Sequence, residues 1–456
     1  MDEVVTIPVE SVAPAAPAAG WQRVVRWPLA PFRFARRRPL RALGVGVAAL
    51  VVTLGAAVGG LLLWFDYHLA AARREVQQGH NASAVRHLRS CQWVRPEQRD
   101  VLILAARVSR RSGAWAEAEI LLDKYSARHG DDGPLVLERL LLRATRGELE
   151  SAVPQLSERI ARAGPEAALS REAIVTGLQY RFRWVEANRV LDEWLALTPE
   201  STVALLLRGK LQEQRLQTSE ALLTFRRILE LDPEYDEARM RLATILLSMR
   251  QGEEAATHAG YLRHRLPANP EVRMQWVRAL GLQGRTAEAR AALDDCLRAH
   301  PDYPAALAER GRYAVQDGED AAAEEYLGRA ARFDPGNFAT RHQLSLVLAR
   351  NGKKAEADAA QAVLRSLEVD TERINTLIQG PLQSTPNDPA VHHEIGLIAL
   401  RSGQPTEALR WFLSAAQVGP DHLPTHQTLA AYYHEIGNPV LEARHRAIAQ
   451  NLSRRK

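Results

Sequence analysis

Cysteine is scarce in this chain of 456 residues, which contains two, Cys91 and Cys296. So few cysteines exclude a zinc site built from paired CxxC motifs. Each cysteine lies five residues before a proline, Pro96 or Pro301, and we expect both to serve as small packing residues. The cysteines therefore point to no metal or redox function.

Catalytic motifs are also lacking: there is no GxxxxGK[ST] loop, no GxSxG elbow and no HExxH motif. Histidines do gather toward the C-terminus, where six of the fourteen lie: His392, His393, His422, His426, His434 and His445. They show no recognised ligand spacing. We predict packing or surface histidines, no catalytic residue, no metal and no cofactor. The alternative is a metal-dependent enzyme, or a regulatory subunit, that uses this cluster.

Charge is concentrated near the start of the chain. The sequence has 59 Lys and Arg against 54 Asp and Glu, a net charge of +5. Residues 1–41 contain seven arginines and three acids, so they carry +4 and the remainder carries +1. Because nucleic-acid binding needs a basic surface, we expect none on the remainder. The excess of arginine over lysine favours a bacterial source with a GC-rich genome.

An uncharged run follows at residues 42–65. As a helix it extends about 36 Å, which is enough to span a bilayer. The arginines before it place residues 1–41 in the cytoplasm and the later residues on the other side. We predict an Ala/Pro-rich disordered cytoplasmic tail at 1–41 and a single-pass anchor at 42–65. A GxxxG pair, Gly55 and Gly59, leaves a homo-oligomer open.

Two alternatives concern this run. A cleaved signal peptide would use the small residues Ala70–Ala72, but the run is longer than the apolar core of about 7–15 residues that is typical of a signal peptide. The second alternative reverses the topology and places the later residues in the cytosol.

A fixed period dominates the later chain. Six prolines recur at one constant spacing: Pro165, Pro199, Pro233, Pro267, Pro301 and Pro335. Five alanines stand twelve positions before five of them: Ala187, Ala221, Ala255, Ala289 and Ala323. In most repeats a glycine stands five positions before the alanine. A small residue lets two helices cross closely, while glycine and proline end helices. The period predicts stacked helix pairs, each in contact only with its neighbours.

This register resembles the tetratricopeptide repeat family, whose period is about 34 residues. Two units carry the resemblance most fully, through Gly209, Ala221, Phe225 and Pro233 and through Gly396, Ala408, Phe412 and Pro420. It covers roughly residues 70 to 452. The resemblance implies an all-α, right-handed superhelical solenoid of about eleven helix pairs after one transmembrane helix. It also implies a concave groove, lined by the first helices, that binds peptides or protein surfaces.

The register breaks once, because Ala357 and Ala408 are one and a half periods apart. We therefore divide the later chain into a repeat array at 66–357, an irregular helical spacer at 358–386, and C-terminal repeats with a cap at 387–456. An extended or extra single helix is expected in the spacer, ended by Gly380, Pro381 and Pro386.

First-helix positions in the central repeats are the candidate contacts for a partner: Lys210, Met240, Met274, Arg278 and Arg312. Thioethers adapt to varied peptide surfaces, although partial burial between repeats explains the methionines equally well. The resulting prediction is a membrane-anchored scaffold that binds a protein or peptide in the groove, in envelope assembly or secretion, and does no chemistry itself.

Overall fold

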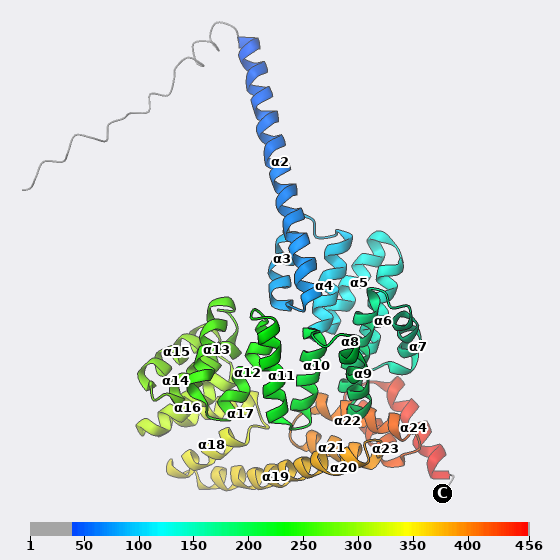
Figure 1. Ribbon diagram of the computed structural model, residues 1–456. Coiled ribbons are helices and arrows are strands. Elements are labelled where there is room, and N and C mark those ends of the chain that lie inside the picture. Colours follow the sequence, from blue (N-terminus) through cyan, green and yellow to red (C-terminus); the bar gives the residue numbers. More distant parts are fainter. Residues whose placement is uncertain (1–38, 455–456) are drawn as a thin grey trace, which may run out of the picture. The chain divides into compact units, whose positions relative to one another are not determined.

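The computed structural model describes residues 39–454, and these are helical throughout, with no strand among them (Figure 1). The chain divides into two compact units, Met1–Asp66 and Tyr67–Lys456. The predicted tail, residues 1–41, lies outside the described residues except for its last three, which begin the helix α2 (Pro39–Gln78).

The first unit contributes the apolar part of α2. Within the described residues, one stretch, Leu50–Gln78, is long and apolar enough to cross a membrane by length and composition, with a mean hydropathy of 1.7. Its early side chains face outward: Val51, Val52 and Leu63 are 61%, 69% and 74% exposed. Farther along, Leu69, Ala72 and Val76 belong to the second unit and are buried. The exposed apolar surface therefore lies on the earlier part of the stretch.

The second unit is a series of helix pairs. First helices follow the end of α2: α4 (Arg99–Arg111), α6 (Gly133–Thr145), α8 (Glu166–Tyr180), α10 (Thr202–Gln214), α12 (Asp236–Ser248), α14 (Pro270–Leu282), α16 (Pro304–Asp317), α18 (Phe338–Arg350), α21 (Pro389–Arg401) and α23 (Leu423–Glu435). Second helices alternate with them: α3 (Asn81–Val94), α5 (Trp115–His129), α7 (Leu149–Ala161), α9 (Trp184–Leu197), α11 (Thr218–Leu231), α13 (Gly252–Arg265), α15 (Thr286–Ala299), α17 (Asp320–Phe333), α19 (Lys354–Gln379), α22 (Pro405–Val418) and α24 (Pro439–Arg454). The predicted all-α solenoid is confirmed.

The repeated residues act as the period predicts. Ala221, Ala255 and Ala289 are completely buried, as close packing of the two helices of a pair requires. The glycines between first and second helices have positive φ, for example +75° at Gly284. Phe182 occupies the same place in its pair and has φ +57°, a strained conformation for a bulky residue.

The out-of-register interval contains most of α19, which extends to Gln379, and the short helix α20 (Pro381–Ser384). Leu364, Leu367 and Leu377 of α19 are buried. Arg401 of α21 donates a hydrogen bond of 2.6 Å to the Asp370 carboxylate, so α19 is tied to the next first helix.

The expectation that each pair contacts only its neighbours is wrong, and two of the contacts that break it join pairs far apart in the sequence. At the first, α22 packs against the turn between α8 and α9. The rings of Trp411 and Phe182 are stacked, with centroids 3.4 Å apart. Arg410 donates to the Tyr180 carbonyl at 3.1 Å, and the Ser414 hydroxyl donates to the Arg181 carbonyl. We call this the closing contact.

The second exception joins the turn between α2 and α3 to the start of α12. His80 contacts the Asp232 carboxylate through Nε2 at 2.6 Å. A Cβ at Gly79 would overlap the hydroxyl of Tyr235, so this close approach, together with φ +87°, requires glycine. The second exception has a further consequence: Gly79 and Tyr235 line two hollows between helix pairs that are far apart in the sequence.

Candidate binding site

The five predicted contact residues line two separate hollows. Lys210 and Met240 line a hollow of about 570 Å³, which we call the α10–α12 hollow. Met274, Arg278 and Arg312 line a hollow of about 730 Å³, which we call the α12–α16 groove. The sequence placed all five on first helices, and the structure brings them together as a pair and a triplet.

The α12–α16 groove combines apolar and polar groups. Met274 is 2% exposed, whereas Arg278 is exposed and has no ion-pair partner among the described residues. Arg312 forms an ion pair with Glu309, and this hydrogen bond raises the pKa of the guanidinium. The groove thus offers a buried thioether beside one unpaired positive charge.

A buried amide also lines the α12–α16 groove. Gln275 is 3% exposed, and its side-chain nitrogen donates to the Met240 carbonyl and to the Thr244 hydroxyl, each at 2.9 Å. Its Oε1 has no hydrogen-bond partner within the described chain. A buried acceptor without a donor is costly, so this oxygen marks a place where a ligand's N–H group would be stabilised.

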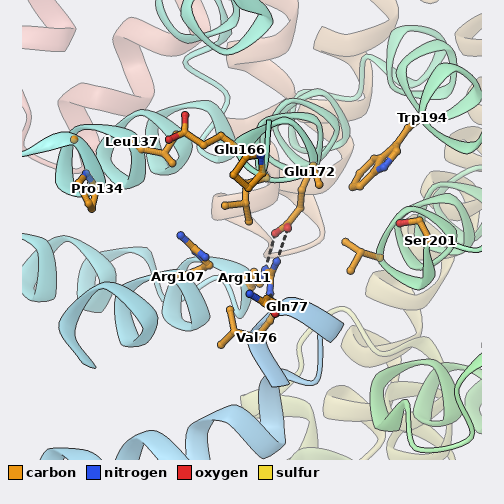
Figure 2. A pocket seen from close by; sticks show the side chains of 15 residues that line it. Val76, Gln77, Arg107, Arg111, Pro134, Leu137, Glu166, Glu172, Trp194 and Ser201 are labelled. Atoms are coloured by element: carbon orange, nitrogen blue, oxygen red, sulfur yellow. Dashed lines mark hydrogen bonds and ion pairs between the residues drawn. The ribbon is translucent and has the colours of Figure 1, made fainter. Parts of the chain in front are cut away.

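Figure 2 shows a further hollow, of about 530 Å³, which we call the α4–α10 hollow. Its polar centre is the ion pair between Arg111 and Glu172, with two hydrogen bonds of 2.8 and 2.6 Å. Arg111 also donates to the Val76 carbonyl at 2.6 Å. Trp194 and Leu137 supply buried apolar surface around this pair.

Three arginines of α4 share two glutamates in this region. Arg107 donates to Glu138 at 2.6 Å, and Arg111 holds Glu172. Burial alone would raise the pKa of Glu172, but the charges of Arg111 and Arg110 outweigh it and lower that pKa to about 2. Glu172 is therefore ionised at neutral pH, and the group carries three positive charges against two negative ones.

Arg110 is the third arginine of this group. It is 2% exposed, and its one hydrogen bond to a side chain runs from Nη1 to the Thr145 hydroxyl at 3.3 Å. Its Nε lies 3.7 Å from Glu138 and its Nη1 lies 3.5 Å from Glu172. Nε and Nη2 have no hydrogen-bond partner in the described residues. Burial lowers the pKa of this guanidinium.

Arg110 lines a small inner cavity of about 80 Å³. The cavity shares six lining residues with the α10–α12 hollow: Gly79, Asn81, Arg111, Lys210, Tyr235 and Glu237. It is therefore the inner end of that hollow.

A family model described as tetratricopeptide repeat matches residues 274–338, a stretch that runs from α14 to the start of α18. The same anchors recur in register on both sides of it, over helix pairs from α3 to α22.

The chain is a tetratricopeptide repeat protein.

Solved structures of similar fold include the APC/C hetero-tetramer Cut9-Hcn1, which is 12% identical over 86% of this chain and 94% of that one, with a TM-score of 0.30. A tetratricopeptide repeat protein from Parabacteroides merdae is 18% identical over 63% of this chain and 99% of that one, with a TM-score of 0.30. YrrB, described as having an unusual peptide-binding site, is 18% identical over 45% and 96%, with a TM-score of 0.26. At these scores the likeness carries no argument about function. A search of the curated proteins found no match.

The C-terminal histidines of this tetratricopeptide repeat protein have structural contacts. His392 and His426 each place Nε2 2.9 Å from the carbonyl of the proline six positions earlier, Pro386 and Pro420. Arg273 donates from the equivalent place to the Pro267 carbonyl at 2.8 Å. These histidines therefore occupy a recurrent position that fixes the turn before a first helix. No group of three or more metal-ligating side chains occurs among the described residues.

The buried charges of the tetratricopeptide repeat protein were missed by sequence reasoning. Glu138 and Glu172 stand one repeat period apart, so the repeat step itself places two acids at matching points of neighbouring first helices. Arg107, Arg110 and Arg111 fall on one helix with spacings of three and four positions. The signal available in the sequence was the recurrence of polar residues at the repeat period, beside the recurrence of the apolar anchors.

Proposed function

We propose that this protein is a membrane-anchored scaffold that holds an extended segment of a partner protein in the α12–α16 groove. Members of the family bind protein or peptide partners, which gives the general function. The observation that carries the location is the buried, unpartnered Oε1 of Gln275 in that groove, where the described residues supply no donor. A peptide N–H group is the donor that an extended partner would bring to it.

The neighbouring groups fit such a segment. Met274 lines the groove with a polarizable thioether, and Arg278 is exposed there with no ion-pair partner among the described residues. An acidic or polar side chain on the partner would pair with Arg278, while the partner's backbone contacts Gln275. We propose no chemistry at this site, since binding explains its groups.

The proposal extends to the membrane. The apolar part of α2 anchors the protein, residues 1–41 face the cytoplasm, and the repeats face the extracytoplasmic side, in envelope assembly or secretion. The seven arginines before the apolar run and the outward-facing side chains of Val51, Val52 and Leu63 support this arrangement.

Affinity purification after crosslinking in cells tests the proposal. Arg278→Glu reverses the unpaired charge in the groove, and Arg298→Glu is the matched control, because Arg298 is an exposed arginine on α15, the second helix of the same pair. We expect partners that are lost from Arg278→Glu and kept by Arg298→Glu, and we expect them to be extracytoplasmic proteins. Identical partner sets would exclude the groove, and cytosolic partners would reverse the topology.

A further inference from the structure

One face of α3, the helix that follows α2, carries a row of exposed side chains. Arg86, Arg89 and Trp93 stand at spacings of three and four positions, so they share this face, which we call the α3 face. Trp93 is 77% exposed. Leu88 and Cys91 are buried on the opposite face of the helix. The α3 face is therefore directed away from the core of the second unit.

Two ring contacts fix the position of the α3 face along α2. The Nδ1 atoms of His68 in α2 and His87 in α3 are 2.8 Å apart, and the ring centroids of Tyr67 and His87 are 6.5 Å apart. After the turn at Gly79, α3 therefore runs antiparallel to the last part of α2 (Figure 1). Tyr67 is the first residue of the second unit, and the apolar stretch of α2 continues from it toward the N-terminus. Trp93 lies beyond His87 in that direction, by about 9 Å along the helix axis.

The charge on the α3 face is positive. Arg86 and Arg89 are exposed and form no ion pair with any described residue. The acidic side chains that follow α3, Glu97 and Asp100, each form an ion pair with another arginine, at 3.3 and 2.5 Å. An exposed tryptophan beside arginines without acidic partners matches a membrane interface, where tryptophan lies at the headgroups and arginine reaches the phosphates.

We propose that α3 is a second membrane contact of this protein, in which the ring of Trp93 lies among phospholipid headgroups and Arg89 and Arg86 face the phosphates. Arg89 is one helical turn from Trp93, about 6 Å farther from the bilayer, which a long side chain can span. The occupant is a phospholipid surface, because the α3 face stands where the exposed apolar part of α2 ends. The inference rests on the membrane anchor of the proposed function and adds a second point of attachment to it.

A second point of attachment restricts the motion of the repeats. A span anchored at one point can tilt relative to the bilayer. Trp93 opposes a tilt that lifts α3 from the surface, because its ring would leave the headgroups. The end of α3 is therefore held at the bilayer.

Spin-label accessibility on the full-length protein tests this contact, in nanodiscs of phosphatidylcholine and phosphatidylglycerol. The buried cysteines are first replaced, by Cys91→Ala and Cys296→Ala, so that one nitroxide reports one position. Glu97→Cys places the nitroxide in the turn after Trp93, and Glu200→Cys places it in the equivalent turn after α9, because both glutamates directly follow a repeat proline. We expect a water-soluble nickel chelate to reach position 97 at least about twofold less than position 200.

Two variants connect the protection of position 97 to Trp93. Trp93→Glu should expose position 97 as fully as position 200, because phosphates repel a carboxylate. Leu197→Glu is the matched control, since Leu197 is an apolar residue at the end of α9 that is 67% exposed, and it should leave position 97 protected. Circular dichroism checks folding, and the comparison of positions 97 and 200 decides the matter if Trp93→Glu fails to fold.

Equal access of the chelate to positions 97 and 200, or unchanged protection in Trp93→Glu, would overturn the α3 contact. A nitroxide at Val52→Cys, in the apolar part of α2, reports the anchor separately. Protection at position 52 with open access at position 97 would reject the α3 contact and leave the anchor intact. Open access at position 52 would reject the anchor of the proposed function, and the α3 contact with it.

Discussion

The region around the closing contact and the central repeats are built from the same repeat unit, yet their cores differ. In the first region, one apolar cluster contains side chains of α6 to α10 together with side chains of α19 to α22. In the central repeats, the clusters join neighbours alone, such as Met274, Leu293 and Tyr313 in α14 to α16. The repeat anchors do not decide this difference. The closing contact uses the ring of Phe182, whereas Gly284 and Gly318 have no side chain at the equivalent turns.

The comparison explains where binding is expected. Repeats that contact only their neighbours keep the surface of their first helices free, as in the α12–α16 groove. Repeats joined across the solenoid enclose space, as in the inner cavity. The same fold thus has a groove along the central first helices and a cavity lined by residues of helix pairs that are far apart in the sequence.

The largest effect is expected from Trp411→Ala, which removes the ring stacked on Phe182. Truncation of a buried tryptophan costs about 3–5 kcal/mol, and Trp411 is 4% exposed. Trp276→Ala in the central repeats should cost less, because Trp276 is only partly buried. Urea unfolding measures both, and equal losses would remove the special role of the closing contact.

The second-largest loss of stability is expected from breaking the buried ion pair between Arg111 and Glu172. Glu172→Gln should cost about 3 kcal/mol, because it leaves Arg111 without its charge partner in a buried place. Glu288→Gln breaks the exposed ion pair between Arg285 and Glu288 at the start of α15. Its effect should be much smaller, because solvent screens exposed pairs. Denaturant midpoints of the two variants test this ranking, and it fails if the exposed pair matters as much.

Glycine substitutions at two equivalent turns should have opposite signs. Leu216 has φ +59° and is 44% exposed, so Leu216→Gly should relieve strain and stabilise the fold by about 1 kcal/mol. Phe182→Gly relieves the same strain but loses the stack on Trp411, and a net loss of about 2 kcal/mol is expected. Thermal unfolding compares them, and stabilisation by Phe182→Gly would contradict our account of the closing contact.

Acid should loosen the C-terminal helices before the central ones. Burial, followed by the neighbouring His426, lowers the pKa of His445 to about 4, and burial also lowers the pKa values of His392 and His393. The folded protein thus prefers neutral rings. Their contribution is complete above the ordinary pKa near 6.5 and is lost as the pH falls toward 4.

Hydrogen-exchange protection factors at about pH 7 and about pH 5 measure this difference. We expect α21 to α24, which hold His392, His393 and His445, to lose more protection than α12 to α16, where burial lowers the pKa of His258 alone among the described histidines. The variant His445→Leu should lose less protection in α24, and uniform loss over both regions would contradict the histidine explanation.

Much of the fold follows from the sequence, because Ala221, Gly284 and Pro233 each have a local role that a fixed period reveals. The contact between Trp411 and Phe182 could not be predicted from the sequence, because the repeat period does not determine how tightly the solenoid winds. For the same reason the predicted residues Lys210 and Arg278 fall into different hollows. Arg110 was missed because a buried arginine in a helix resembles an exposed one in sequence.

Site-specific photo-crosslinking in cells tests the central claim most directly. A benzoylphenylalanine placed at Arg278, in the α12–α16 groove, is compared with one at Arg298 on α15. Our account predicts a defined protein adduct at position 278 and none at position 298. No adduct at 278, or the same adducts at both positions, would contradict binding in the groove.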